Sequence, residues 1–398
     1  MEKEFVGVIL GGDVNSYAVA RAFYEEYKIK TIVIGIKPIY PTAYSKLIEG
    51  YYYKDLLDSK VLLKALKELN DKYPNKKKIL LGNIDYYVRH ILENKKEIER
   101  ISNTYIIPMT SLKQFDTLVN KKEFYELCDK YGLDHPKGIV FDFQKDNIEK
   151  FEIPFEFPIF IKPSDSVVYS RYDFDGKQKG YKIENLDELK KVIINIKNSG
   201  FNGLFLFQEY IEGDDNSMYV FTCYTNRKHQ VKAITAGKIL MHDRTPELIG
   251  NYNAITNAYN ETLSLKLKNF LEKINFTGIC HFDVQYDIKN DRYVVFEINI
   301  RQGRSNYYTL ASKTNLMKLI VDDYIYNKEQ EFFIANTSFV ASIPPKWALK
   351  KSLKKNNQKI EIKNFSRFTL APYDRNLKRY YYQYRWDKKI IRDFFKYN

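Results

Sequence analysis

Cysteine is scarce in this chain of 398 residues, which contains only Cys128, Cys223 and Cys280. The three are widely separated and show no paired spacing, which argues against a disulfide framework and a cysteine-based zinc site. Long apolar segments are also absent, since nowhere do about 18 apolar residues follow one another. The chain passes from MEKE directly into FVGVIL without a leader pattern. We therefore expect a cytoplasmic protein that is neither exported nor inserted into a membrane.

The glycines near the N-terminus lack the three-glycine spacing of a dinucleotide fingerprint, which argues against NAD. Residues 5–36 nevertheless predict strand, tight loop, helix and strand, the opening of a Rossmann-like α/β domain. Ligands on such sheets collect at the carboxyl ends of strands, so Asp13, Asn15 and Ser16 are candidates for binding a small substrate. The alternative, which the sequence supports equally, is that Asp13 or Ser16 only caps the helix.

The length and composition indicate how many domains the protein has and which classes of partner are compatible with it. A hydrophobic content of 44% over this length supports a substantial core and two or three domains. The formal net charge of +14 is compatible with nucleic acid, anionic lipid or anionic substrates such as ATP. Composition alone does not choose among these partners.

Residues 278–305 are the most informative stretch of the chain. Two alternating runs, 280–286 and 293–301, flank a polar turn and predict a β-hairpin. Alternation in the second run places Glu297, Asn299 and Arg301 on the face opposite to its apolar residues. A five-residue turn at 288–292 would pair Asp283 with Glu297, and directly opposed residues have Cβ atoms about 5 Å apart.

Two carboxylates at this separation repel each other unless one is protonated or a cation lies between them. Oxygen ligands from Asp283, Glu297 and Asn299 suit a hard ion such as Mg²⁺, with Mn²⁺ as a substitute. Arg301 adds a fixed positive charge suited to phosphate oxygens. For any one of these residues alone, the simpler interpretation is a polar strand face exposed to water.

The spacing D-x(13)-E-x-N-x-R resembles the metal-binding end of the ATP-grasp superfamily, and further motifs extend the resemblance over roughly residues 5–326. It implies an α/β (α+β) protein of the ATP-grasp fold, with an N-terminal Rossmann-like domain and a nucleotide cleft between two α+β subdomains. It also implies that Asp283, Glu297 and Asn299 hold Mg²⁺ against ATP, and that Arg301 contacts the transferring group. Expected domains are 1–112 (substrate domain), 113–207 (small lid subdomain), 208–330 (large subdomain with the metal site) and 331–398 (basic aromatic extension).

Two lysines match phosphate-binding positions of that superfamily. Lys121 follows an asparagine near the start of a helix that we expect over residues 118–132, and the resemblance implies that it reaches the nucleotide phosphates. Lys162 ends a short apolar strand at 158–162, where a mostly buried ammonium would need an anionic partner. The resemblance pairs Lys162 with a lid loop, here residues 164–180. This loop has few glycines, so its phosphate contacts are left open, with Ser164 and Ser166 as candidates.

The segment QEYI resembles the linker that reads adenine in ATP-grasp enzymes. The resemblance implies that Glu209 and Ile211 contact the base through backbone groups on either side of Tyr210. It also implies that Gln208 approaches the exocyclic amine and that Asp215 binds the ribose hydroxyls. A solvent-facing turn is the alternative for Asp215.

Two further regions carry chemistry. Arg304 and Ser305 are expected at a helix start, where they could grip an anion. A lone His242 is more typical of a structural or surface residue than of a catalyst. The basic aromatic segment 331–398 favours an amphipathic helix packed on the body over contact with a membrane surface or nucleic acid.

More narrowly, FEFPIFIKPSDSVVY, IEGDDNSMYV, FEINIRQGRS and a PPKW turn resemble the D-aspartate ligases of Gram-positive bacteria. The resemblance implies a ligase that activates D-aspartate at its β-carboxyl group with ATP and joins it to the lysine side chain of a peptidoglycan precursor. Arg301, Lys162 and Arg304 would be catalytic; Arg304 and Ser305 would also bind the substrate carboxylate, and Asp13 or Asn15 its ammonium.

Two alternatives remain at this point. One is an ATP-grasp ligase that joins another amino acid or small carboxylate to an amine. The other, from a different class, is a basic protein that binds nucleic acid or an anionic surface through a degenerate nucleotide fold. We expect no nucleic-acid partner, because the complete metal triad argues against degeneration. Peripheral contact with the inner face of the membrane would go with the C-terminal segment, and the oligomeric state is left open.

Overall fold

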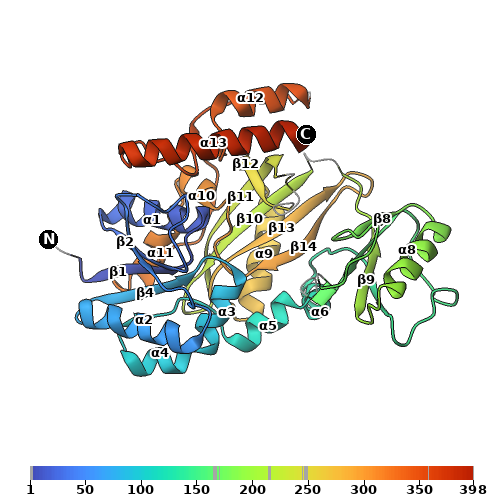
Figure 1. Ribbon diagram of the computed structural model, residues 1–398, viewed down its shortest axis with the longest axis horizontal. Helices are drawn as coiled ribbons and strands as arrows, with labels where there is room; N and C mark the ends of the chain where they lie inside the picture. The colour runs from blue at the N-terminus through green and yellow to red at the C-terminus, as the bar shows by residue number, and fades with distance from the viewer. Residues whose placement is uncertain are drawn as a thin grey trace. The chain divides into compact units, whose positions relative to one another are not determined.

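The computed structural model describes residues 3–164, 168–169, 171–213, 217–243, 245, 250–356 and 358–397 (Figure 1). The chain divides into two compact units. Unit 1 comprises Met1–Leu133, Asp214–Val284 and Glu297–Asn398, and unit 2 comprises Asp134–Gly213 and Gln285–Phe296.

The N-terminal part of unit 1 is built on a parallel sheet, as the Rossmann-like prediction requires. Its five strands are ordered β3-β2-β1-β4-β5 and pair in parallel throughout. Apolar residues on both faces of this sheet are buried in two clusters. The strands are β1 (Phe5–Leu10), β2 (Thr31–Gly35), β3 (Ile48–Tyr52), β4 (Lys77–Gly82) and β5 (Tyr105–Ile106).

Strand β3 was missed by the sequence analysis because it lies at the sheet edge and is only partly buried, so it lacks an apolar run. The helices of this part are α1 (Val14–Tyr27), α2 (Ser59–Lys72), α3 (Asp85–Glu93) and α4 (Lys95–Ile101).

Asparagines divide two helices that the sequence analysis predicted as continuous. The helix over 85–97 is interrupted at Asn94, whose amide donates to the carbonyl oxygen of His90 at 2.8 Å. The helix over 118–132 is divided at Asn120 into α5 (Leu112–Val119) and α6 (Lys121–Tyr131). The Asn120 side chain accepts from the first backbone N–H groups of α6, which makes Lys121 the first residue of that helix. Gly132 ends α6 at φ 73°, as predicted.

A mixed eight-stranded sheet forms the rest of the framework of unit 1, ordered β14-β13-β10-β11-β12-β16-β17 with β15 also pairing with β11. Its strands β13 and β14 continue into unit 2 through residues 285–296. The strands are β10 (Met218–Thr225), β11 (Val231–His242), β12 (Tyr252–Ala258), β13 (Gly278–Asp287), β14 (Arg292–Asn299), β15 (Phe333–Ala335), β16 (Val340–Ser342) and β17 (Phe365–Arg367). The helices are α9 (Glu261–Lys273), α10 (Tyr307–Ala311) and α11 (Leu316–Tyr324).

Unit 2 contains a four-stranded antiparallel sheet ordered β6-β9-β7-β8. Its core is rich in phenylalanine, with the Phe141 and Phe207 rings stacked at 5.2 Å between centroids. Lys162 is half-buried rather than mostly buried, because β7 alternates between fully and partly covered positions. The elements are β6 (Gly138–Asp142), β7 (Ile159–Pro163), β8 (Tyr181–Ile183), β9 (Leu204–Glu209) and α8 (Leu186–Asn198).

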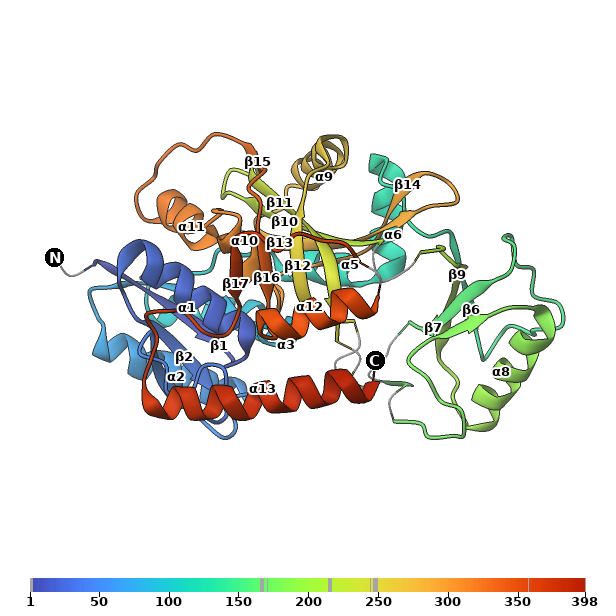
Figure 2. The same cartoon turned by 90° about the horizontal axis from the view of Figure 1, so that it is seen from above.

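The C-terminal segment is part of unit 1. It supplies β15, β16 and β17 to the large sheet, together with α12 (Lys346–Lys355) and α13 (Leu377–Tyr397). Figures 1 and 2 show α13 running along one side of unit 1. In the described part of the chain, no helix combines the length and apolar content needed to cross a membrane.

A fully buried ion pair fixes α13 to the N-terminal domain. Arg379 lies 2.7 Å from Asp374, and neither side chain is exposed to solvent. The guanidinium also donates to the carbonyl oxygens of Pro41, at 2.7 Å, and Thr369, at 3.0 Å. The hydroxyl of Tyr17, in α1, donates to Asp374 at 2.8 Å. Buried charges are stable only when they are paired and hydrogen-bonded, and here the two charges are paired with each other and Arg379 also donates to two backbone carbonyl groups.

We expect Arg379→Ala to lower the free energy of unfolding by about 3–5 kcal/mol, because it leaves the buried Asp374 carboxylate without its counter-ion. Urea denaturation followed by circular dichroism would measure the change. Arg385→Ala, on an exposed position of the same helix, is the matched control and should stay within about 0.5 kcal/mol of the parent. Equal stabilities of the two variants would contradict the assignment.

Candidate active site

The structure brings together the three residues that the sequence analysis assigned to a metal site. The Asn299 amide donates to Asp283 Oδ2 at 3.0 Å, and the carboxyl groups of Asp283 and Glu297 are hydrogen-bonded neighbours. Tyr252 of β12, which the sequence analysis did not select, donates its hydroxyl to Asp283 Oδ1 at 2.8 Å. Strand alternation therefore predicted the grouping, whereas the contact from Tyr252 depends on the sheet order.

The turn of this hairpin is one residue shorter than predicted. It covers residues 288–291, because Arg292 already belongs to β14. The Asp287 carboxylate accepts from the Asn290 side chain at 2.8 Å and from Arg292 Nε at 3.1 Å, which closes the turn at that position. The five-residue turn that the predicted register required is therefore absent, although Asp283 and Glu297 still meet.

Burial makes it unfavourable for both carboxyl groups of this pair to be ionised at the same time. Burial, reinforced by the neighbouring Glu297, raises the pKa of Asp283 to about 7. The Tyr252 hydroxyl acts in the opposite direction by donating to the ionised form. A divalent cation would take the place of the proton that this pair retains. Among the described residues there is no cluster of three or more His, Cys, Asp or Glu side chains that could hold a metal, so any ligand set here combines two carboxylates with the Asn299 amide.

Two basic residues predicted to contact phosphates are held by carboxylates. Lys121 Nζ lies 2.7 Å from Glu297 Oε2. Arg301 Nε lies 2.9 Å from Asp85 Oδ1, and its Nη2 approaches Asn299 Oδ1 at 3.4 Å. The sequence analysis missed Asp85, although its position just after β4 is one where ligand-binding residues of open α/β sheets gather.

His281 supports the backbone beside Arg301. Burial, followed by the nearby Arg301 charge, lowers the pKa of His281 to about 4, so the imidazole is neutral at physiological pH. Its Nδ1 lies 3.2 Å from the carbonyl oxygen of Arg301. A Cβ atom on Gly303 would lie only 2.7 Å from His281 Cε1, so a larger residue at this position would displace the His281 ring.

The surroundings of Arg304 and Ser305 differ from the expected helix start. Helix α10 begins only at Tyr307 and has five residues, so Arg304 and Ser305 lie in the preceding turn. Arg304 Nη1 lies 3.7 Å from Asp243 Oδ2 and 3.4 Å from Asn253 Oδ1. These partners were missed because they belong to other strands and loops of the sheet, and no sequence pattern connects them with Arg304.

In the first loop, the capping alternative is what the structure shows. Asp13 accepts from the backbone N–H of Val14 at 2.6 Å and is the N-cap of α1. Ser16 donates to the carbonyl oxygen of Gly11 at 2.8 Å. These contacts explain the two residues structurally and leave a substrate role for Asp13 as a proposal.

The Asn15 side chain connects α1 with the backbone of two other segments of the chain. Its buried amide donates to the carbonyl oxygens of Asn83, after β4, and of Gln302, after β14. Asn83 Oδ1 and Gln302 Oε1 are buried and have no hydrogen-bond partner among the described residues. These two side-chain oxygens are therefore hydrogen-bond acceptors to which no described residue donates.

The predicted adenine-binding segment lies at the end of β9 in unit 2. Gln208 is buried, and its Oε1 has no hydrogen-bond partner in the described part of the chain. The Glu209 carboxylate accepts from Lys137 N and from Arg292 Nη2, both at 2.9 Å, so its side chain is engaged. The Ile211 carbonyl accepts from Gln285 at 3.2 Å.

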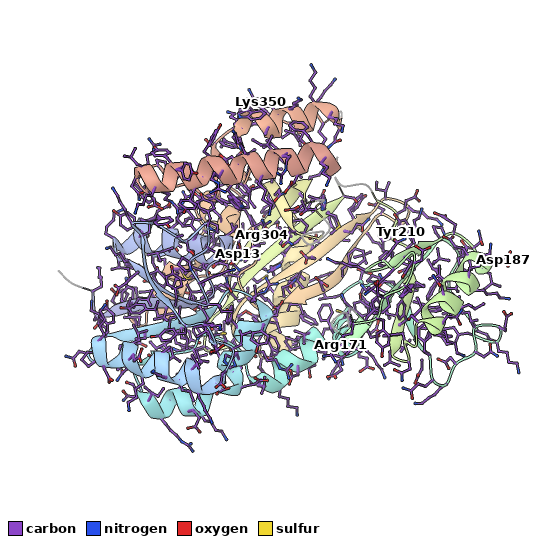
Figure 3. All side chains as sticks on the ribbon, viewed as in Figure 1. Asp13, Arg171, Asp187, Tyr210, Arg304 and Lys350 are labelled. Atoms are coloured by element: carbon purple, nitrogen blue, oxygen red, sulfur yellow. The ribbon has the colours of Figure 1, made fainter. Side chains whose placement is uncertain are left out.

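The remaining predictions in this region differ in how far the structure describes them. The ammonium of Lys182 lies over the Tyr210 ring, 4.7 Å from the ring centroid. Figure 3 labels Tyr210 in unit 2, and Asp13 and Arg304 in unit 1. Asp215 and Ser166 lie outside the described residues, whereas Ser164 is described and donates its backbone N–H to Leu204 O at 2.9 Å.

A comparison with curated proteins decides the family. The chain is 35% identical over 334 residues to a D-aspartate ligase of Enterococcus faecium (strain Aus0004), covering 82% of this chain and 78% of that protein. The chain belongs to the D-aspartate ligase family. No protein-family model matches it.

Solved structures confirm the fold of this D-aspartate ligase family member. An N5-carboxyaminoimidazole ribonucleotide synthetase in complex with ADP has a TM-score of 0.62 at 13% identity, covering 98% of each chain. An L-amino acid ligase from Bacillus licheniformis has a TM-score of 0.56 at 12% identity, covering 81% of this chain and 74% of that one. The chain therefore has the predicted ATP-grasp fold, and it is an ATP-dependent carboxylate–amine ligase.

The raised pKa of Asp283 predicts how the stability of this ligase depends on pH. Between its ordinary value of 3.8 and about 7, the folded state keeps a proton that the unfolded state has lost. Stability contributed by this group is therefore lost as the pH rises through that window. We expect Asp283→Asn to gain stability relative to the parent as the pH rises from 4 to 8.

Thermal unfolding at pH 5 and pH 8 would test this expectation, with the exposed Asp71→Asn as the matched control. Mg²⁺ should stabilise the parent protein more at pH 8 than at pH 5, and this difference should shrink in Asp283→Asn. A difference between Asp283→Asn and the parent that does not change with pH would refute the electrostatic interpretation.

Proposed function

We propose that this protein joins D-aspartate, through its β-carboxyl group, to the lysine side chain of a peptidoglycan precursor. The observation that carries the proposal is the 35% identity to a D-aspartate ligase over most of both chains. The carboxylate and amide group on β13 and β14 supports the same chemistry, because it supplies oxygen ligands beside basic residues. We place the reaction in the cytoplasm, where ATP is available.

The chemistry requires activation of the carboxylate. A carboxylate does not acylate an amine directly in water, because its oxygen is a poor leaving group. Transfer of the γ-phosphoryl group from ATP gives an acyl phosphate and ADP. The lysine amine then attacks the carbonyl carbon, the carbon–oxygen bond to phosphate breaks, and the ammonium proton is lost. No side-chain nucleophile takes part, so the protein contributes positioning and charge.

We propose that Asp283, Glu297 and Asn299 hold Mg²⁺, or Mn²⁺ in its place. The fit is supported by the raised pKa of Asp283, because a cation between the two carboxylates would offset their repulsion. Once bound there, the ion would offset negative charge on the ATP phosphates. Tyr252 orients Asp283 by donating to one carboxylate oxygen, and Asn299 contacts the other.

We propose that Lys121, Lys162 and Arg301 neutralise charge on the phosphoryl group during transfer. In the structure, Glu297 holds Lys121 and Asp85 holds Arg301, so both long side chains are already ordered. This ordering lowers the conformational entropy that binding must remove. Lys162 lies on β7, a strand of unit 2 paired on both sides, which limits its movement.

We propose that the end of β9 binds the adenine ring. The buried, unpaired Oε1 of Gln208 supports this, because an exocyclic amine is the donor that such an acceptor lacks. Glu209, Tyr210 and Ile211 would contribute backbone and ring contacts. We assign the ribose hydroxyls to Asp215 on its position in the motif.

We propose that Arg304, with Ser305, binds the carboxylate of D-aspartate that does not react. Asp243 and Asn253 keep the Arg304 guanidinium in place in the meantime. We assign the substrate ammonium to Asp13 or Asn15. The unpaired acceptors on Asn83 and Gln302 beside Asn15 support this location, since an ammonium has three donors to satisfy.

The deciding experiment is a panel of D- and L-amino acids, each incubated with ATP, Mg²⁺ and a lysine-containing precursor. We expect a new amide, detected by its mass, and release of phosphate with D-aspartate above all others. Preferential reaction of L-aspartate, D-alanine or glycine would refute the substrate and leave the ligase mechanism intact. Arg304→Ala should raise the KM for D-aspartate while ATP affinity stays close to normal, the pattern of lost substrate binding.

Glu297→Gln and Asn299→Ala should each lower turnover by at least about a hundredfold, the effect expected when one preorganised charge stabiliser is lost. Steady-state phosphate release at saturating Mg²⁺ would measure the change. Glu261→Gln, on the exposed start of α9, is the control and should retain full turnover. Near-normal turnover of both folded variants would rule out the metal assignment.

A further inference from the structure

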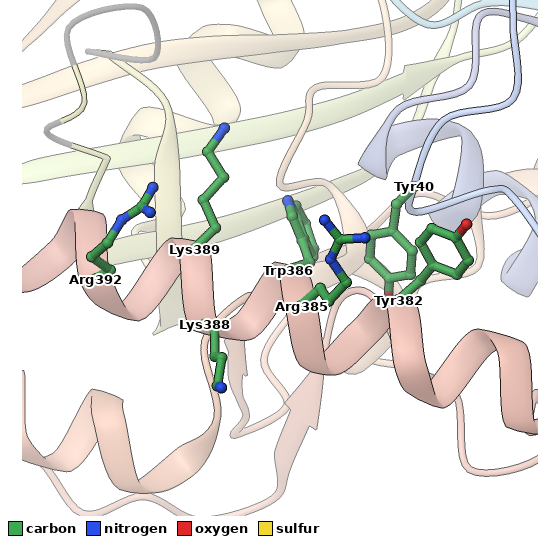
Figure 4. Close-up of a pocket in the computed structure, with 7 residues that line it drawn as sticks. All are labelled: Tyr40, Tyr382, Arg385, Trp386, Lys388, Lys389 and Arg392. Atoms are coloured by element: carbon green, nitrogen blue, oxygen red, sulfur yellow. The ribbon is translucent and has the colours of Figure 1, made fainter.

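A concave site lies beside α13, and none of its lining residues is used in the proposed mechanism. It is a hollow of about 780 Å³ lined by Tyr40, Tyr382, Arg385, Trp386, Lys388, Lys389 and Arg392 (Figure 4). This volume is within the range of small-molecule sites. The lining combines four basic side chains with three aromatic ones and contains no carboxylate.

Part of the positive charge of this lining is not neutralised by neighbouring acids. In the portion of the chain that the structure describes, neither Arg385 nor Lys389 pairs with a carboxylate. Arg392 contacts only the adjacent Asp393, at 3.1 Å. Arg385 and Lys389 are four residues apart on one helix, and like charges at this spacing disfavour the helix. An anionic ligand would remove that repulsion.

The aromatic part of the pocket is held rigidly. The Trp386 ring packs against Tyr40 with 4.9 Å between centroids, and the Tyr40 hydroxyl donates to Gln383. Gln383 in turn donates to Asp387 at 2.6 Å, and Asp387 is paired with Arg367, also at 2.6 Å. The ring surface is therefore ordered before any ligand arrives, which lowers the entropic cost of binding.

The side chains that line the pocket do not all point to the same side of α13. Figure 4 shows Trp386, Lys389 and Arg392 on the same side of the helix, whereas Lys388 points to the opposite side. Lys388 Nζ lies 4.6 Å from the ring centroid of Tyr384. Lys388 borders the hollow, but its ammonium points away from those of Lys389 and Arg392, so it provides an internal control on the same helix.

We propose that this pocket binds a soluble diphosphate ester that carries a planar ring, the chemistry of a nucleoside diphosphate. Cations one helical turn apart, with Cβ atoms about 5–6 Å from each other, match two linked phosphate groups. Arg385 and Arg392 can bind phosphate oxygens through two parallel N–H groups, and Lys389 acts as a point charge. The ring of the ligand stacks on Trp386, as bases stack on aromatic side chains elsewhere.

The chain offers a direct reporter for this site. It contains two tryptophans, so Trp347→Phe leaves Trp386 as the only one. We expect the fluorescence of this variant to change in a saturable way with inorganic pyrophosphate and more strongly with uridine or adenosine diphosphate. Titrations without Mg²⁺, repeated after Lys162→Ala is added, separate this response from binding at the proposed ATP site, because the pocket affinity should not change.

Arg385→Ala and Lys389→Ala should each weaken diphosphate binding about tenfold or more, the effect of losing one charge-assisted contact. Lys388→Ala should leave the affinity within about twofold. Thermal unfolding of each variant verifies that the fold is retained, since all three positions are exposed.

Three outcomes would overturn the proposal. One is the absence of a saturable response to pyrophosphate and to both nucleotides. Another is binding that Arg385→Ala and Lys389→Ala do not weaken. The third is Lys389-dependent binding to vesicles of anionic phospholipid without affinity for the soluble diphosphates, which would assign these cations to membrane contact instead.

Discussion

The mutual repulsion of two carboxylates on neighbouring strands is the constraint around which the active-site half of this ligase is arranged. Asp283 and Glu297 share one polar strand face, and burial makes their simultaneous ionisation costly, as the raised pKa of Asp283 shows. The surrounding structure reduces this cost without removing it. Tyr252 donates to Asp283, and Lys121 pairs with Glu297. The proposed Mg²⁺ would complete this compensation.

The same logic extends to the second layer of charges. Asp85 orders Arg301, and Asp243 with Asn253 orders Arg304. Each basic group is therefore held by a partner on another segment of unit 1. Because Arg301 and Arg304 have long side chains, this prior ordering lowers the conformational entropy that binding of their proposed ligands must remove. The neutral His281 and Gly303 support the backbone that connects Arg301 with Arg304.

The C-terminal segment has a structural and a chemical side. Its buried Arg379–Asp374 pair anchors α13 to the loop that carries Pro41 and Ala43. That anchor also places Tyr40 against Trp386, and so it shapes the basic aromatic pocket. The composition describes this segment only as basic and aromatic. In the structure, it contains both a buried ion pair and a concave surface lined by cations.

What the sequence by itself determined is local in origin. Alternation with period two put Glu297, Asn299 and Arg301 on one face of β14, and the order of the motifs indicated the ATP-grasp fold. Gly132 ended α6 because only a residue that tolerates φ 73° fits there without strain. These features depend on neighbours within a few residues, so they can be read from a single chain.

Only the tertiary structure showed which side chains contact the predicted site residues. Tyr252, Asp85, Asp243 and Asn253 are polar residues without a distinctive spacing, and they reach the site because sheet order brings distant segments together. Arg379 gave no sign of full burial, since its carbonyl acceptors Pro41 and Ala43 lie far away in the sequence. Hydrogen-bond and charge satisfaction is a property of the folded interior, and no local pattern of residues encodes it.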